Sequence, residues 1–140
     1  MESPIGTIAS LAASGTQTVG TIPINYNRSI YVTIRGTFHG SATGNLTINA
    51  LYSPDGKNWD TEACDTFDLA VSAGNACQTT QALALPEHGD VLIQVENADA
   101  VYAATGISVW VSFQSWPTWG KGAGGTPQAV EQEVGRRGGR

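Results

Sequence analysis

The chain has 140 residues, with 12 Asp and Glu against 7 Lys and Arg, and a formal net charge of −5. This is the length of a single domain, and a charged fraction of 14% is too low for disorder driven by charge repulsion. No apolar run reaches the roughly 18 residues that span a bilayer, and the first residues do not look like a secretory signal. We therefore expect no membrane partner. Residues 51–100 hold nine acidic residues and one Lys, so we also expect no nucleic-acid partner.

Apolar and polar residues alternate along most of the chain, with the period of two that is typical of half-buried strands. In residues 107–113 this alternation turns Val109 and Val111 inward and Trp110 outward. Turn residues such as Pro54-Asp55-Gly56 separate the alternating runs. Strands are predicted at 16–24, 29–38, 46–52, 59–67, 75–85, 90–96 and 107–113.

Seven or eight short strands without alternating helices predict an all-β fold. We expect an antiparallel β-sandwich, either a jelly roll or an immunoglobulin-like fold, over residues 16–119. Residues 1–15 and 120–140 are rich in small residues and glycine, so we predict flexible N- and C-terminal arms there. Such arms bury too little apolar surface to fold alone and would become ordered against neighbours.

Few residues carry recognisable reactive chemistry. His39 and His88 lie beside glycines, without further ligands at metal-site spacing, and the serines lack nucleophile motifs. We therefore predict no enzymatic activity and no cofactor. Asp55, Asp60 and Glu62 are weak candidates for calcium ligands, but no metal site is expected, because the carboxylates of the predicted strand 59–67 fall on both of its faces. A hydrolase that uses this cluster is the least favoured alternative.

The two cysteines, Cys64 and Cys77, lie on either side of a predicted turn at residues 72–75. On paired strands they could face each other, and a disulfide there would contribute about 3 kcal/mol. The alternative is two reduced thiols.

Three of the four tryptophans, Trp110, Trp116 and Trp119, lie within ten residues near the end of the predicted sandwich. They could cap an open end of the core, stack on a sugar, or anchor an interface, where Trp is enriched. The chain ends in a basic tip with Arg136, Arg137 and Arg140. We include these six residues in a candidate interface that could join copies head to tail.

Three short runs have a pattern of residues similar to that of known virion proteins: Gly36-Thr37-Phe38, Asn45-Leu46-Thr47 and Ser53-Pro54-Asp55-Gly56-Lys57-Asn58-Trp59. Together they resemble β-sandwich structural proteins of tailed bacteriophages, in which paired strands and an Asp-Gly turn lead into a Trp-bearing strand. The resemblance implies a non-enzymatic virion protein that is made in the host cytoplasm.

The same resemblance implies a capsid decoration (cement) protein or another minor head or tail protein. Its partners would be the major capsid protein, other virion proteins and further copies of itself, bound through the arms and the aromatic residues. The alternative is a carbohydrate-binding or host-attachment β-sandwich that uses Trp and the acidic loops with help from calcium.

Overall fold

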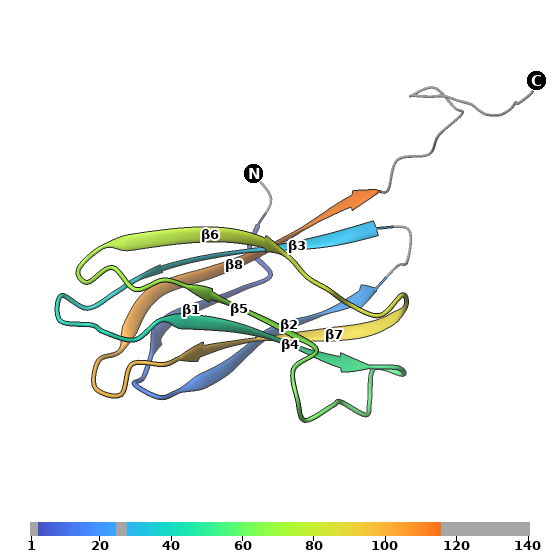
Figure 1. The fold of residues 1–140 in the computed structure, drawn as a ribbon, viewed down its shortest axis with the longest axis horizontal. Coiled ribbons are helices and arrows are strands. Elements are labelled where there is room, and N and C mark those ends of the chain that lie inside the picture. The colour runs from blue at the N-terminus through green and yellow to red at the C-terminus, as the bar shows by residue number, and fades with distance from the viewer. Residues whose placement is uncertain (1–2, 25–27, 116–140) are drawn as a thin grey trace, which may run out of the picture.

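The computed structural model describes residues 3–24 and 28–115 (Figure 1). Within these residues there is no helix long and apolar enough to cross a membrane. The described residues form eight β-strands: β1 (Gly6–Leu11), β2 (Thr16–Ile24), β3 (Arg28–Thr37), β4 (Leu46–Ser53), β5 (Asp65–Leu69), β6 (Ala76–Ala82), β7 (Gly89–Asn97) and β8 (Ala104–Ser115).

The strands form two four-stranded antiparallel sheets that pack face to face (Figure 1). Sheet A has the order β1-β8-β3-β6, and sheet B has the order β2-β7-β4-β5. The pairs β1–β8, β2–β7, β3–β6 and β4–β5 are nested, as in one long hairpin wrapped into two layers. This is the connectivity of the eight-stranded jelly roll and differs from the immunoglobulin arrangement. The prediction of an all-β antiparallel sandwich is confirmed, and the jelly roll is the form that it takes.

The core lies between the sheets and consists of the inward residues of each alternating strand. Val32 and Ile34 of β3, Ile48 of β4, Ile93 of β7 and Val109 of β8 are completely buried. Most of these side chains are β-branched and pack well on a pleated surface. A shift of one residue in the register of any strand would move its buried side chains to the solvent-facing side of the sheet, so the alternation also determines the register.

The N-terminal segment corrects the predicted arm of residues 1–15. Residues 6–11 form β1, which pairs along β8 from Gly6 opposite Val109 to Leu11 opposite Ala104. Ile8 and Leu11 are only 4% and 5% exposed and belong to the core. Ile8 and Leu11 are surrounded by small residues, and two apolar residues are too few to show a period of two in the sequence. They are nevertheless enough to bury one face of a short edge strand. The predicted C-terminal arm, residues 120–140, lies outside the described residues.

The strand predicted at 59–67 is wrong in its first half. The chain runs as a loop through residues 54–64, and β5 begins only at Asp65. Two isolated backbone hydrogen bonds join the loop to β4, from the N–H of Asp60 to the Tyr52 carbonyl and from the N–H of Cys64 to the Ala50 carbonyl, both at 2.8 Å. At the start of the loop, the Ser53 hydroxyl of β4 accepts a hydrogen bond from the Gly56 N–H at 2.8 Å. Of the residues between these two backbone bonds, Thr61 and Glu62 are exposed and Ala63 is half-buried, so this stretch lacks the alternating burial of a strand.

Candidate functional site

The turn after β4 uses Asp55 as a structural residue. Its Oδ1 accepts hydrogen bonds from the backbone N–H groups of Lys57 and Asn58, both at 2.8 Å, and its Oδ2 accepts one from the Asn58 side-chain amide at 2.7 Å. These bonds, above all the one from the Asn58 backbone, hold the pKa of Asp55 well below its usual range. Gly56 follows with a φ of 75°, as the predicted tight turn requires. The Asp55 carboxylate therefore holds the turn together.

The other weak metal candidates do not converge with Asp55. Asp60 and Glu62 are exposed on the loop 54–64, beyond the turn that engages Asp55. Across residues 3–24 and 28–115, no three His, Cys, Asp or Glu side chains are grouped so that they could hold a metal ion.

A shallow pocket of about 400 Å³ lies where the loop 54–64 borders the outer face of sheet B. Its walls combine an amide from β4, an amide from β7, a carboxylate and a hydroxyl with two apolar side chains. The Asn49 amide nitrogen also donates to Glu96 Oε1 at 3.2 Å. Such a lining can bind hydroxyl or amide groups of a small polar ligand. The lining residues are Asn49, Leu51, Asp60, Thr61, Ala63 and Gln94.

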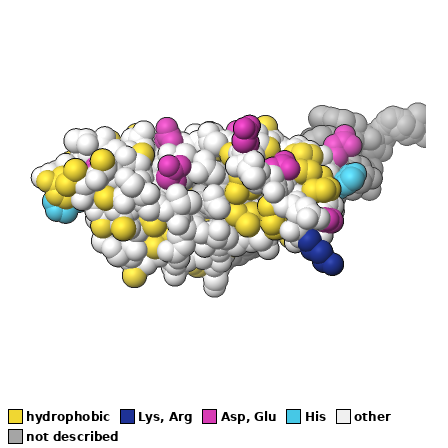
Figure 2. Space-filling view, turned by 90° about the horizontal axis from the view of Figure 1, so that it is seen from below, with side chains coloured by type: hydrophobic (Ala, Val, Ile, Leu, Met, Phe, Trp, Pro, Cys, Tyr) yellow, Lys and Arg dark blue, Asp and Glu magenta, His cyan; other side chains and the backbone are white. Residues whose placement is uncertain are grey.

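The outer face of sheet B is acidic. Asp68 of β5 accepts a hydrogen bond from Thr47 at 2.8 Å, and Glu96 of β7 lies near the pocket. Asp and Glu side chains are scattered over this side of the molecule among apolar and other side chains (Figure 2). Asp60 and Glu62 of the loop add to the same negative potential.

The outer face of sheet A has the opposite character. Trp110 of β8 lies opposite Thr33 of β3, and Tyr31 of β3 lies opposite Ser112 of β8 and Ala82 of β6. Trp110 is half-buried between the fully inward Val109 and Val111, so it points outward, as the alternation predicts. Most of the other outward residues of this face are Ser, Thr and Gln.

Arg35 is the only charged residue among the described side chains of the four strands of sheet A. The outer face of sheet A is therefore nearly uncharged and carries the large aromatic side chains of Trp110 and Tyr31. Trp116, Trp119, Arg136, Arg137 and Arg140, the remaining members of the predicted interface, lie outside the described residues.

The carbohydrate-binding alternative that combines Trp with the acidic loops needs both features at one site, but the structure places them on opposite outer faces of the sandwich. Trp110 stands on sheet A, whereas the acidic loop 54–64 borders sheet B. Because the core lies between the sheets, Trp110 and this loop do not form a single binding site.

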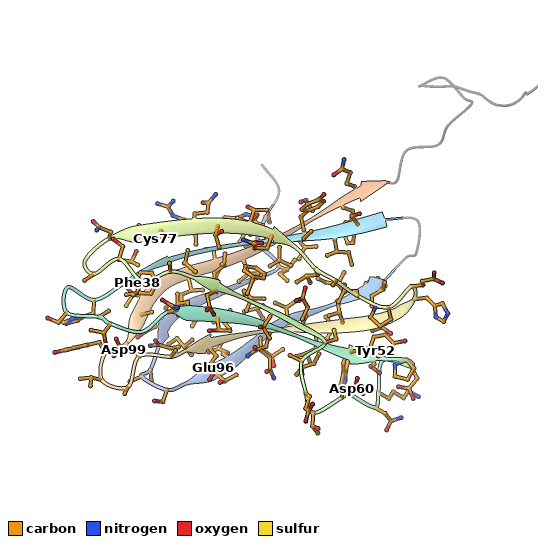
Figure 3. The ribbon with its side chains drawn as sticks, in the orientation of Figure 1. Phe38, Tyr52, Asp60, Cys77, Glu96 and Asp99 are labelled. Atoms are coloured by element: carbon orange, nitrogen blue, oxygen red, sulfur yellow. The ribbon has the colours of Figure 1, made fainter. Side chains whose placement is uncertain are left out.

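The possible disulfide is not formed: Cys64 and Cys77 are both free thiols, which is the alternative that the sequence left open. The predicted turn at residues 72–75 crosses from sheet B to sheet A, so β5 and β6 do not pair as a hairpin. The N–H of Ala84 donates to Asp65 Oδ2 at 2.7 Å, which places Cys64 beside the far end of β6. Cys77 lies about seven residues back along the chain, roughly 23 Å at strand spacing, beyond the ~7 Å limit for a disulfide. Figure 3 shows Cys77 at the same end of the sandwich as Phe38, and Asp60 at the opposite end.

The end of the sandwich near Asp99 contains a buried polar network that sequence reasoning missed. Asp99 is 3% exposed, and its carboxylate accepts four backbone N–H groups. Two of these bonds come from the β3–β4 loop (Thr43 and Gly44, 2.7 and 3.0 Å) and two from the β7–β8 loop (Val101 and Tyr102, both 2.8 Å). The bonds lower the pKa of Asp99 well below its usual range, with the Tyr102 N–H as the largest cause.

Asn97 extends this network to the β1–β2 loop. Its amide nitrogen donates to the carbonyls of Leu11, Ala12 and Tyr102 at 3.2, 3.3 and 3.0 Å. The sequence does carry a signal, because Asn97 continues the inward series of Val91, Ile93 and Val95 on β7. A polar residue at an inward position needs internal partners. Nearby, the rings of His39 and Tyr102 stack at 4.1 Å.

Comparison with known proteins gives similarity at the level of structure alone. No protein-family model and no curated protein matches the sequence. The chain is similar to one chain of the infectious bursal disease virus VP2 subviral particle, with a TM-score of 0.47 and 12% identity over 79% of the present chain. It is also similar to a chain of the T13 IBDV viral particle, with a TM-score of 0.42 and 15% identity over 81% of the present chain. The matched regions span 30% and 29% of those two chains.

Proposed function

We propose that this chain is a non-enzymatic structural protein of a virion that acts by adhesion to neighbouring subunits. The observation that carries the proposal is the composition of the outer face of sheet A. Trp110 and Tyr31 stand there mainly among Ser, Thr and Gln, with Arg35 as the single charge among the described side chains of the sheet's strands. The buried centres of protein interfaces are depleted in charge and enriched in Tyr and Trp.

Two further features support a virion as the place of action. Jelly rolls of this connectivity form viral capsid domains, although lectins and cupins also use them. The runs around Phe38, Leu46 and Trp59 resemble virion proteins of tailed bacteriophages. Within a virion we propose a capsid decoration (cement) protein or another minor head or tail protein, made in the host cytoplasm. Its partners are the major capsid protein or other virion proteins.

In this proposal the two faces have different roles. Sheet A rests on the neighbouring subunit, and the acidic face of sheet B stays in solvent. The basic tip with Arg136, Arg137 and Arg140 gives a second contact on a tether. Two linked contacts bind more tightly than either alone because the second is intramolecular.

The first test uses particles purified from the source of the sequence. Mass spectrometry is expected to find the chain as a stoichiometric component of those particles. Recombinant protein should co-sediment with particles that lack it, and Trp110→Ser should weaken binding roughly 30-fold, as expected for a hot-spot aromatic residue.

Leu51→Ser, on the outer face of sheet B, is the matched control and should bind as the wild type does. Absence of the chain from purified particles would refute the proposed function. Equal binding by the Trp110→Ser variant would refute the role of sheet A.

Removal of residues 120–140 tests the tethered contact. We expect the unfolding transition of the trimmed chain to be unchanged, because the described core ends at β8, and binding to particles to weaken. A trimmed chain that no longer folds would show that this segment belongs to the domain.

A second candidate function, carbohydrate binding, is favoured by the pocket on sheet B. The side chains of Asn49, Gln94 and Asp60 offer amide and carboxylate groups that suit sugar hydroxyls, next to the apolar Leu51. A glycan array with and without calcium is the appropriate test. A glycan signal that is abolished by Gln94→Ala and unaffected by Trp110→Ser would establish this function in place of adhesion through sheet A.

A further inference from the structure

The two sheets have four edge strands, and one side of the sandwich is closed. There β1 and β2 approach so closely that a Cβ added at Gly6 would lie 2.5 Å from the Val19 carbonyl oxygen. Strand β2 also contains Pro23 and a register shift between Thr18 and Gly20. Proline and bulges are among the devices that keep edge strands from pairing with other chains.

The opposite side of the sandwich is formed by the edge strands β5 and β6. Strand β5 is five residues long and carries Asp65 and Asp68, which discourage pairing. Strand β6, Ala-Cys-Gln-Thr-Thr-Gln-Ala, has no charge, no Pro and no Gly. Its register against β3 is continuous from Tyr31 opposite Ala82 to Thr37 opposite Ala76. Of the four edges, β6 is thus the one without a protecting device.

The hydrogen-bond pattern shows which backbone groups of β6 face outward. At one end of the ladder the Leu83 N–H donates to the Ile30 carbonyl at 2.9 Å, and at the other the Phe38 N–H donates to the Asn75 carbonyl at 3.0 Å. Antiparallel pairing alternates, so residues 77, 79 and 81 also bond to β3. The N–H and C=O groups of Ala76, Gln78, Thr80 and Ala82 point away from β3.

The free edge has a defined end. Ala84 is the next residue in the outward series, and its N–H is already bound to Asp65 Oδ2 at 2.7 Å. Gln78, Thr80 and Ala82, the three outward residues next to this end, are therefore available to a further strand.

We propose that β6 pairs antiparallel with β6 of a second copy of this chain, about a two-fold axis at Thr80. In this register Thr80 lies opposite Thr80 of the second copy, and Gln78 lies opposite Ala82 of the second copy. Every outward N–H and C=O of the three residues is then paired on both chains, and the two A sheets join into one eight-stranded sheet. A two-fold contact of this kind is closed and self-complementary.

Charge and composition favour a second copy over other occupants. The chain carries a net charge of −5, so its copies repel each other wherever acidic residues meet. Strand β6 has no acidic residue, and Thr–Thr and Gln–Ala are neutral cross-strand pairs. The segment 116–140 is a poor alternative occupant, because it contains seven Gly and two Pro, which are depleted in strands.

This inference concerns the isolated chain and does not depend on the proposed function. The test is the mass in solution, measured by sedimentation equilibrium over a concentration series. We expect the wild type to approach twice 14.6 kDa as concentration rises. Thr80→Lys brings two like charges together at the axis and should raise the dimer Kd at least about tenfold.

Two further variants separate the contact from the fold. Thr80→Pro removes an outward N–H that β3 does not use, so it should also give monomers while the circular dichroism spectrum is retained. Thr7→Lys, an exposed position on β1 of the same sheet, is the matched control and should dimerise as the wild type does. A wild type that remains at 14.6 kDa throughout, or equal effects of Thr80→Lys and Thr7→Lys, would overturn the proposal.

Cross-linking tests the register directly. In a Cys64→Ser, Cys77→Ser background, Thr80→Cys places two thiols across the axis. A hydrogen-bonded antiparallel pair has its Cα atoms about 5.5 Å apart, within the range for a disulfide. Mild oxidation should give a covalent dimer from Thr80→Cys and none from Thr7→Cys. The same low yield from both variants would refute this register, whatever the outcome of the particle-binding experiment.

Discussion

The side-chain oxygen of Asn97 accepts a hydrogen bond from the backbone N–H of Asp99 at 3.0 Å, and the two residues together tie three loops of the sandwich. Asn97 holds the β1–β2 loop through Leu11 and Ala12. Asp99 holds the β3–β4 loop through Thr43 and Gly44. Both also bind Tyr102 of the β7–β8 loop. This end of the molecule is therefore held by buried polar contacts in addition to the apolar core.

Asn97→Ala is expected to lower the free energy of unfolding by about 2–3 kcal/mol, because it leaves several buried backbone groups without a partner. Chemical denaturation measures the loss. Asn49→Ala is the control, since the Asn49 side chain makes one hydrogen bond on the half-buried outer face of sheet B. Similar losses for the two variants would show that the Asn97 network adds nothing to stability.

Stability should fall in acid through Asp55 and Asp99. Backbone N–H groups hold the pKa of both carboxyls below the unfolded value of about 3.9. Their stabilisation is complete above that unfolded value and is lost as the pH falls through the lower folded values. Urea unfolding at a series of pH values below about 4 should therefore show a falling midpoint.

Asp99→Asn should flatten this acid dependence and lower the midpoint at neutral pH, because an amide cannot accept all four N–H groups. Asp68→Asn, with a single exposed bond from Thr47, should leave both nearly unchanged. A steep acid dependence retained in the Asp99→Asn variant would assign the effect to other groups.

Gly44 packs directly against the chain at Asp99. A Cβ at this position would lie 2.5 Å from the Cα of Asp99 and 2.6 Å from the carbonyl carbon of Ala98. Gly44→Ala is expected to cost roughly 1–3 kcal/mol of unfolding free energy, as overpacking does. Gly40→Ala is the matched control, because no atom lies within 4 Å of a Cβ at Gly40. Thermal unfolding of the two variants should differ clearly, and equal transitions would contradict the close packing at Gly44.

The thiols of Cys64 and Cys77 should remain reduced and separate. Addition of a reductant is expected to leave the melting temperature unchanged, and Ellman's reagent should titrate both thiols in denaturant. Burial raises the pKa of the Cys64 thiol, and the charges of Asp65 and Asp60 add to this effect. In a Cys77→Ser background, Asp60→Asn should therefore speed the reaction of native Cys64 near pH 8. A melting temperature that falls with reductant would indicate a disulfide after all.

Local sequence was enough to predict most strands. The inward series Val91, Ile93 and Val95 and the outward position of Trp110 follow from a period of two, which is a property of neighbouring residues. The turn at Asp55 and Gly56 was likewise readable, because an Asp side chain and a Gly backbone act within a few residues. These features determined the all-β class and the approximate strand boundaries.

Contacts between distant residues were decided only by the tertiary structure. The sequence does not state that β5 and β6 belong to different sheets, so the separation of Cys64 from Cys77 could not be foreseen. The same holds for β1, which the sequence predicted as part of an arm. Its two core residues become buried only when β1 pairs with β8. The nearly uncharged face of sheet A and the acidic face of sheet B exist because the jelly roll brings β3, β6 and β8 together on one side. Strand pairing depends on which edges meet in three dimensions, and alternation within a single strand carries no information about its neighbour.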